Sequence, residues 1–371
     1  MASENRPRTV VGTMTGTSID ALDVAIARIH GAGLEMRAEL IAVEQTPLGA
    51  LKAPLRAAAD QTPMSALEFA RLAHRFGRLH VEAVSSLTER LGITPDLICL
   101  HGQTVAHEPP VGWALLDTTP LLAHFECRIV TELRHLDMAH GGQGAPISPL
   151  ADWILFRGER PRTIVNLGGF CNITSLPGVS GGWSQVTGRD VCPCNHLLDE
   201  GARRWLGAPM DHNGTRAMRG TANPALSVEL AETMGAHRDD TSEPTRALAQ
   251  GDEGRALLDR LESLPAVEDR LATLTSALAM RLCRAVTPDE ELVLFGGGTF
   301  NQALVDDIAD ARRSAPTRTG LNDVTPSARE ALVMAVLGAC AEDGLMITPS
   351  GASSQLRNVA HLAGKWLWPA R

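Results

Sequence analysis

A short segment near the N-terminus combines residue types that suit phosphate binding. It consists of Gly16, Thr17, Ser18, Ile19 and Asp20. Because β-prone stretches, Thr9–Met14 and Leu22–Ile29, flank this segment, we expect it to form the tip of a hairpin. The backbone amides and hydroxyls of such a tip could hold phosphate oxygens, and Asp20 is placed to bind Mg²⁺ through water. The alternative is an ordinary turn built from residues that favour turns.

Two further glycine-rich turns strengthen the first signal. Gly168-Gly169 ends a β-prone stretch and has Asn166 and Asn172 as polar neighbours. Gly296-Gly297-Gly298 follows a predicted strand at Leu292–Phe295 and precedes a predicted helix from about Asn301 to Ala311, so a flat base or sugar could approach the backbone there. Each turn is a weak signal alone, but together, in this order, they predict a nucleotide held between two halves of the chain.

Polar loops follow two other predicted strands. His101-Gly102-Gln103-Thr104 comes after the apolar stretch Leu97–Leu100, and Arg128–Val130 leads into Arg134 and Gly141-Gly142-Gln143-Gly144. In α/β proteins the ends of strands usually carry ligand-binding loops. We therefore treat these loops as candidate binding segments.

The elements that would position these loops occur as two similar units about 150 residues apart. Each unit begins with a predicted three-strand meander, Thr9–Met14, Leu22–Ile29 and Leu40–Val43 in the first, and Thr163–Leu167, Phe170–Leu176 and Trp183–Val186 in the second. Predicted helices run from Ser65, with a capping box to Glu68, to about Gly92, and over Leu197–Leu206, Val267–Val286 and Ala328–Ala341. The segment Gly235–Gly254 is rich in charged residues, and we expect it to lie on the surface. The pattern predicts a duplicated α/β fold with domains at 1–150 and 151–371.

Composition excludes several classes of function. The chain has 371 residues and a net charge of −9, which argues against a general affinity for nucleic acid or for anionic membranes. It contains no apolar run near the roughly 18 residues of a spanning helix and starts with a polar segment, so we expect a cytoplasmic protein. Its only lysines are Lys52 and Lys365, and neither lies in a Walker A loop, a protein-kinase strand or a pyridoxal site.

Seven cysteines, an odd number, predict reduced thiols in the protein core. One cluster, Cys192-Pro193-Cys194-Asn195-His196, raises the alternative of a zinc or redox site. Its spacing is not that of a C-x2-C zinc pair, and the proline restrains the loop. A metal site is therefore the less favoured interpretation.

The order and spacing of these motifs resemble the anhydro-N-acetylmuramic acid kinases, a family of the actin-like, hexokinase-like ATPase superfamily. The resemblance runs from about Val10 to the C-terminal tail. It rests on Met14–Asp23, His101–Thr104, Gly141–Pro146, Asn166–Gly169, Gly296–Gly298, and Asp190 with Pro193 and Asn195.

The resemblance implies a fold and a reaction. It implies two RNase H-like α/β domains on either side of a cleft, with ATP and Mg²⁺ on one side, an amino sugar on the other, and a homodimer as the assembly. The family hydrolyses the 1,6-anhydro bridge of anhydro-N-acetylmuramic acid and phosphorylates O6, which gives N-acetylmuramic acid 6-phosphate for cell-wall recycling.

The resemblance also assigns roles to residues. Asp190 falls on the catalytic aspartate, which would deprotonate the attacking water; the alternative is a loop carboxylate or helix cap. ATP and phosphate contacts are implied for Gly16, Thr17, Ser18, Ile19, Asp20, Asp23, Gly168, Gly169, Gly296, Gly297 and Gly298. Sugar and lactyl-carboxylate contacts are expected for His101, Gln103, Thr104, Arg134 and Gln143, with hydrogen bonds that only fix the loops as the alternative.

The chain departs from the family pattern at several positions. Thr15 and Ala21 stand where the family usually has serine and glycine, and Cys192 and Cys194 replace glycines beside Pro193. A family segment containing lysine is replaced near residues 235–260, and Ser350-Gly351-Ala352 replaces Thr-Gly-Ala. These changes leave two alternatives open: a related kinase for another anhydro or amino sugar, and a nucleotide-binding pseudokinase in which the two cysteines block water.

Overall fold

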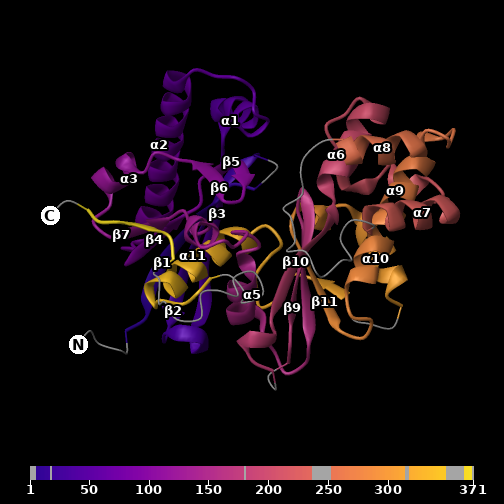
Figure 1. Ribbon diagram of the computed structural model, residues 1–371. Helices are drawn as coiled ribbons and strands as arrows, with labels where there is room; N and C mark the ends of the chain where they lie inside the picture. Colours follow the sequence, from indigo (N-terminus) through magenta and orange to yellow (C-terminus); the bar gives the residue numbers. More distant parts are fainter. Residues whose placement is uncertain are drawn as a thin grey trace. The chain divides into compact units, whose positions relative to one another are not determined.

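The protein is built from two compact units with the same sheet topology. The computed structural model describes residues 6–16, 19–178, 181–235, 252–313, 317–347 and 363–369. One unit comprises Met1–Phe156 and Ala328–Arg371, and the other comprises Arg157–Ser327. Figure 1 shows the chain of the first unit in indigo and magenta, with the C-terminal helix of the same unit in yellow.

The first unit contains a six-stranded sheet in the order β13-β7-β4-β1-β2-β3. Strands β1, β2 and β3 form the predicted antiparallel meander, and β4 and β7 continue the sheet in parallel with β1. The strands are β1 (Arg8–Met14), β2 (Ala21–His30), β3 (Arg37–Pro47), β4 (Leu97–Leu100), β5 (Gln103–Glu108), β6 (Val111–Leu115), β7 (Arg128–Thr131) and β13 (Lys365–Leu367). The helices are α1 (Lys52–Ala59), α2 (Ala66–Leu91), α3 (Thr119–His124), α4 (His135–Ala139), α5 (Ser148–Phe156) and α11 (Arg329–Glu342).

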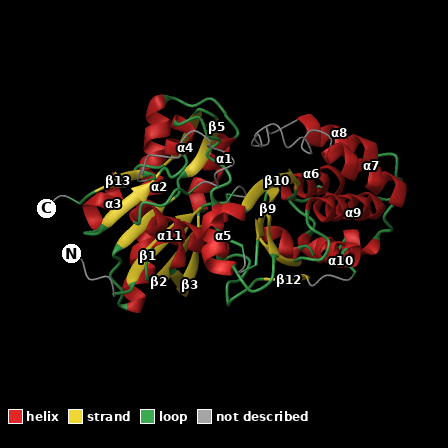
Figure 2. Ribbon diagram, turned by 60° about the horizontal axis from the view of Figure 1, so that its bottom comes forward, coloured by secondary structure: helices red, strands yellow, loops and turns green. Residues whose placement is uncertain are grey.

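Helices cover both faces of this sheet (Figure 2). Helix α2 begins at the predicted capping box, in which the Ser65 hydroxyl accepts the Glu68 backbone N–H, and ends at Gly92 with φ of 62°. Its apolar side packs with Val11 and Val24 on one face. Helix α11 lies against the other face, because a Cβ added at Gly12 would lie 2.2 Å from the Ala331 carbonyl oxygen. Only glycine allows this close approach of strand and helix.

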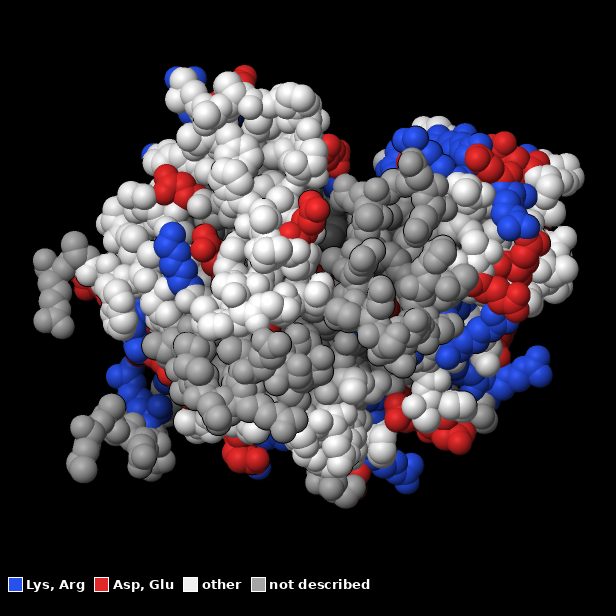
Figure 3. Space-filling model, in the orientation of Figure 1, with Lys and Arg blue, Asp and Glu red and all other residues white. Residues whose placement is uncertain are grey.

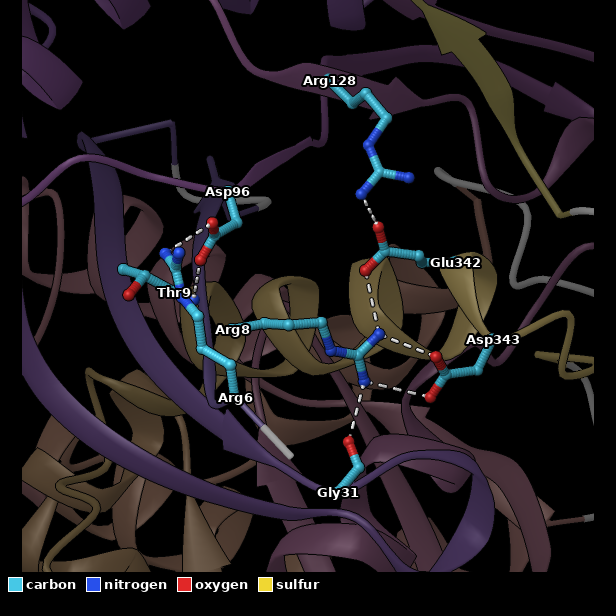
Figure 4. A network of polar contacts seen from close by, with 8 residues as sticks. All are labelled: Arg6, Arg8, Thr9, Gly31, Asp96, Arg128, Glu342 and Asp343. Carbon is cyan, nitrogen blue, oxygen red and sulfur yellow. Dashed lines mark hydrogen bonds and ion pairs between the residues drawn. The ribbon is translucent and has the colours of Figure 1, made fainter. Parts of the chain in front are cut away.

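Ion pairs fix the C-terminal end of α11 near the start of β1 (Figure 4). The Arg8 guanidinium donates to Asp343 at 2.7 and 3.0 Å and to Glu342 at 2.9 Å. Arg128, at the start of β7, also contacts Glu342. Because parallel strands start at one edge of a sheet and end at the other, this network lies at the edge opposite the loops that follow β1, β4 and β7.

The second unit repeats the arrangement with a five-stranded sheet in the order β10-β9-β8-β11-β12. Strands β8, β9 and β10 are antiparallel neighbours, and β11 and β12 run parallel to β8. The strands are β8 (Arg162–Leu167), β9 (Phe170–Leu176), β10 (Thr187–Pro193), β11 (Glu291–Phe295) and β12 (Thr317–Thr319), and the helices are α6 (Asn195–Leu206), α7 (Pro224–Gly235), α8 (Asp252–Leu261), α9 (Val267–Ala285) and α10 (Gln302–Ala311). In both units a meander is followed by two parallel strands, so the predicted duplicated α/β fold of RNase H-like type is confirmed.

Two details differ from the sequence predictions. The stretch Trp183–Gln185 forms a 3-10 turn, and the third strand of the second meander begins only at Thr187. The chain also returns to the first unit at Ala328, whereas the predicted division kept 151–371 together. The reason is that α11 is apolar on nearly every side and packs on β1, β2 and α5 of the first unit.

The surface of the second unit carries charges of both signs (Figure 3). Arg204 contacts Asp259 at 2.7 Å and Glu262 at 2.6 Å.

In the part of the chain that the structure describes, no helix has both the length and the apolar character needed to span a membrane. Most of the predicted charged segment Gly235–Gly254 lies outside the described residues.

Candidate active site

The turn between β1 and β2 contains the first predicted phosphate-binding segment. The Ile19 backbone N–H donates to the Gly16 carbonyl at 3.1 Å. Ile19 has a positive φ of 53°, an unusual conformation for a β-branched residue, and its side chain is fully buried. Any ligand contact of Ile19 would therefore be made by its backbone. Thr17 and Ser18 lie outside the described residues.

Two aspartates near this turn differ in their surroundings. Asp20 is half-exposed, and its Oδ1 lies 2.5 Å from the Lys52 Nζ. Asp23, on β2, accepts a hydrogen bond of 2.7 Å from the Gln45 side chain. Burial, together with the nearby charge of Glu330 at the start of α11, raises the pKa of Asp23 to about 6. This half-buried carboxylate is therefore partly protonated below neutral pH.

The loops that follow β4 and β7 meet at His101 and Arg134. The His101 Nδ1 lies 2.7 Å from the Gly102 carbonyl, and because a carbonyl only accepts, Nδ1 carries the proton. Its Nε2 then accepts from the Arg134 Nε at 3.3 Å, and the Arg134 Nη1 donates to the Gly144 carbonyl at 2.8 Å. Burial and the adjacent guanidinium lower the pKa of His101 to about 3. His101 is therefore a neutral acceptor that orients Arg134.

The other predicted sugar contacts lie at the start of β5 and in the glycine-rich loop after β7. Gln103 is 4% exposed, its amide nitrogen donates to the Thr104 carbonyl at 3.3 Å, and its Oε1 is buried without a protein partner. Because a buried acceptor without a partner costs free energy, a ligand donor or a water molecule at this oxygen would be stabilising. The Gln143 backbone forms a hydrogen bond with the His107 ring.

Sequence reasoning missed Asp137, which holds the glycine-rich loop after β7. Its Oδ2 accepts the Gly144 backbone N–H at 2.7 Å. A Cβ added at Gly142 would lie 2.2 Å from the same oxygen, so the glycine leaves room for the carboxylate. Asp137 lies in a short helix and nothing in its local sequence distinguishes it from a surface residue.

In the second unit, the two predicted glycine turns and the start of α6 come together. The Gly168 carbonyl accepts the Asn195 backbone N–H at 3.0 Å, and the Gly169 carbonyl accepts the Cys194 backbone N–H at 2.8 Å. The Asn195 side chain donates to the Leu167 carbonyl at 3.0 Å. The Gly168-Gly169 turn is thereby fixed against the first turn of α6.

The Gly296-Gly297-Gly298 loop packs on the same turn. A Cβ at Gly296 would lie 2.8 Å from the Leu167 carbonyl oxygen, and one at Gly298 would lie 2.7 Å from the Leu167 Cβ. At Gly297, by contrast, the nearest atom would be the Asn195 Nδ2 at 3.6 Å, so space remains beside this residue. Two of the three glycines are thus needed for packing, and the middle one leaves room that a ligand could use.

Helix α10 does not begin directly after the Gly296-Gly297-Gly298 loop. A 3-10 turn occupies Gly297–Phe300, and α10 begins at Gln302. The Asn301 side chain accepts the Leu304 N–H at 3.1 Å and caps the helix.

Asp190 lies on strand β10 and not in a loop. It pairs across the sheet with Asn172, and the register between the two strands shifts between Asp190 and Cys192. Bulges of this kind redirect side chains and are frequent beside active sites. The Asp190 side chain is half-buried. A hydrogen bond with Cys192 and burial raise the pKa of the nearby Cys171 thiol, and the charge of Asp190 adds to this shift.

The cysteines around Asp190 are core residues. Cys192 and Cys194 are each 1% exposed and pack with the apolar residues of the second unit. Burial raises the pKa of the Cys194 thiol well above its usual range, which makes it unreactive. Among the residues described, no group of three or more His, Cys, Asp or Glu side chains could hold a metal ion. The two thiols thus point into the core, which weakens the interpretation that they block access to Asp190.

The sequence was compared with known proteins. A sequence model of the anhydro-N-acetylmuramic acid kinase family matches residues 8–358. An anhydro-N-acetylmuramic acid kinase of Salinibacter ruber is 32% identical over 94% of this chain and 92% of its own length. The corresponding kinase of Chromohalobacter salexigens is 35% identical over 80% of this chain and 82% of its own.

Solved structures with a similar course of the chain were also found. The activator of 2-hydroxyisocaproyl-CoA dehydratase from Clostridium difficile, with bound ADPNP, aligns over 95% of this chain and 99% of its own, with a TM-score of 0.44 and 14% identity. The match of the family model over nearly the whole sequence, and of relatives above 30% identity, decides the assignment: the chain belongs to the anhydro-N-acetylmuramic acid kinase family.

Proposed function

We propose that this protein is an ATP-dependent kinase that opens the 1,6-anhydro ring of anhydro-N-acetylmuramic acid and phosphorylates O6. The product is N-acetylmuramic acid 6-phosphate, an intermediate of peptidoglycan recycling. The observation that carries the proposal is the family match over residues 8–358. The repeated sheet topology and the meeting of two glycine turns in the second unit support it.

The residues present fit a nucleotide and a divalent cation. ATP would supply the γ-phosphoryl group. The turns at Gly16–Asp20 and Gly168-Gly169 offer backbone amides for phosphate oxygens, and the space beside Gly297 suits the adenosine. Asp20 supplies a carboxylate, the ligand type that Mg²⁺ prefers, and would hold the ion through water, while Asp23 on β2 remains a proposed ATP contact. These donors would replace the lysine of a P-loop.

Asp190 is proposed as the general base. Its carboxylate would take a proton from a water molecule, whose oxygen bonds to the anomeric carbon while the bond from that carbon to O6 breaks. The released O6 would then bond to the γ-phosphorus of ATP as the bond from that phosphorus to the bridging oxygen breaks and ADP leaves. A strand position beside a bulge holds such a base more firmly than a loop would.

The sugar would be held by the loops of the first unit. Arg134 is oriented by the neutral His101 and by the Gly144 carbonyl, so its position is set before substrate arrives. A guanidinium held in this way suits the lactyl carboxylate of the substrate. Gln103 Oε1, buried without a protein partner, would accept a hydrogen bond from a hydroxyl or an amide N–H. Thr104, at the start of β5, and Gln143, in the loop after β7, remain proposed contacts.

A pair of substrates tests this function. We would measure ATP consumption with anhydro-N-acetylmuramic acid and with 1,6-anhydro-N-acetylglucosamine, which lacks the lactyl carboxylate. The wild type should prefer the first sugar, and Arg134→Gln should lose most of that preference, because the guanidinium that would bind the lactyl carboxylate is removed together with its hydrogen bonds to His101 and Gly144. If the protein binds ATP but consumes it with neither sugar, the result would contradict the proposal and favour a pseudokinase. A preference for another amino sugar would point to a different substrate. We further propose a cytoplasmic homodimer, the dimer being testable by sedimentation equilibrium.

A further inference from the structure

A buried ion pair joins two helices of the first unit that are far apart in the sequence. Asp152 on α5 is 0% exposed and Arg329, the first residue of α11, is 3% exposed. The Arg329 Nε and Nη2 donate to the Asp152 Oδ1 at 3.0 and 2.7 Å, and Nη2 donates to Oδ2 at 2.5 Å. Two planar groups joined by parallel hydrogen bonds fix both distance and orientation. None of the proposed catalytic or binding roles uses this pair.

The place of the pair along the chain is its second distinctive feature. The chain leaves the first unit after Phe156, the last residue of α5, and re-enters it at Ala328, directly before α11. Asp152 lies one helical turn before the exit, and Arg329 lies one residue after the return. The ion pair therefore joins the two segments through which the chain passes between the units.

The same helix start packs on the strands that carry the proposed phosphate-binding turn. Helix α11 lies against both β1 and β2, the two arms of that turn. A Cβ added at Gly12 on β1 would lie 2.2 Å from the carbonyl oxygen of Ala331, in the first turn of α11. A shift of the first turn of α11 would therefore displace the strand that leads into Gly16.

We propose that Asp152 and Arg329 are positioning residues for the kinase reaction. Their ion pair holds the first turn of α11 on α5, and it thereby fixes that turn against β1 and β2, the two arms of the proposed phosphate-binding turn. Neither residue needs to touch a substrate for this role. The proposal rests on the proposed kinase function, since it concerns how that reaction is organised.

The first test compares the two ends of the same helix. Asp152→Asn removes the α5 carboxylate that holds the start of α11, and Arg8→Gln removes the ion pairs at the C-terminal end of α11. Both variants should unfold at a lower temperature than the wild type. Asp152→Asn should lower kcat/KM for ATP at least tenfold, whereas Arg8→Gln should stay within about twofold of the wild type. Equal kinetic effects of the two variants would overturn the proposal.

A double variant separates positioning from stability. Replacing a buried ion pair by apolar residues of similar volume often preserves stability, so Asp152→Leu combined with Arg329→Met should remain folded. Under the proposal this double variant keeps the kinetic defect, because no bidentate contact fixes the helix start. Recovery of wild-type kinetics together with stability would overturn it.

A readout without turnover keeps this test apart from the proposed function. Calorimetry with a non-hydrolysable ATP analogue and Mg²⁺ should show at least tenfold weaker binding by the double variant than by the wild type. Equal affinities would contradict the positioning role. If the wild type binds the analogue but turns over no anhydro sugar, the proposed substrate fails while the binding comparison still decides the role of the ion pair.

Discussion

Gly297 offers a sharp test of the proposed adenosine site, because a methyl group added there meets little of the protein itself. The new Cβ would lie 3.6 Å from the Asn195 Nδ2, an ordinary van der Waals contact. The substitution Gly297→Ala should therefore change the free energy of unfolding by no more than about 0.5 kcal/mol. Any ligand that approaches this backbone closely would, however, meet the added methyl group.

Gly296 provides the matched control one residue earlier. Its φ is +86°, and a Cβ there would lie 2.6 Å from the Asn166 Oδ1 and 2.8 Å from the Leu167 carbonyl oxygen. The left-handed conformation alone costs a residue with a side chain about 1 to 2 kcal/mol, and the contacts add to this cost. Gly296→Ala should therefore lower stability clearly, in contrast to Gly297→Ala.

Calorimetry with a non-hydrolysable ATP analogue, beside urea unfolding, measures both effects. For Gly297→Ala we expect a loss of at least tenfold in affinity, about 1.4 kcal/mol, with little change in the unfolding midpoint. Unchanged affinity in a stably folded Gly297→Ala variant would refute the placement of adenosine at this loop. A large loss of stability would refute the packing argument.

Three further predictions follow from the charges in the first unit. Asp23→Asn should stabilise the fold by about 2 kcal/mol at pH 8 but not below about pH 4. Because the pKa of Asp23 is raised to about 6 in the folded protein, the wild type loses stability as the pH rises through 6 and this carboxylate becomes charged. Urea unfolding at both pH values tests the prediction. The lowered pKa of His101 has the opposite sign, so this residue should contribute a loss of about 2 kcal/mol between pH 7 and 5, measured as the difference in pH dependence between the wild type and His101→Gln in the same assay. Lys52→Gln should lower the Mg²⁺ concentration needed for half-maximal activity, because Lys52 competes for Asp20; an unchanged Mg²⁺ titration would argue against Asp20 as a ligand.

Local signals in the sequence were sufficient where the structure depends on local chemistry. The capping box at Ser65 and the glycine at position 92 define both ends of α2, because caps satisfy the backbone groups that a helix leaves unpaired. The glycine-rich turns could also be located from local sequence, because glycine adopts the backbone conformations that turns require. The third strand of the second meander was misplaced, because Thr187–Pro193 is mostly polar at its start and contains a bulge that breaks the alternation.

Long-range pairing could not be read from the sequence. Asp152 and Arg329 are separated by 177 positions, and nothing near either residue indicates its partner. Asp137 was missed likewise, because its role depends on the fold of the loop that ends at Gly144. The apolar pattern of α11 predicted a helix but not the unit that it joins, since a helix buried on nearly all sides has no single apolar face.

The central claim is that Asp190 activates water for a reaction that both opens the sugar ring and phosphorylates it. Mass spectrometry of the sugar after incubation with ATP, Mg²⁺ and anhydro-N-acetylmuramic acid tests this claim most directly, with Asp190→Asn as the matched variant. The wild type should yield a product that has gained one water and one phosphoryl group, and Asp190→Asn should yield none while it still binds the ATP analogue. A product that keeps the anhydro ring, or wild-type turnover by Asp190→Asn, would contradict the account.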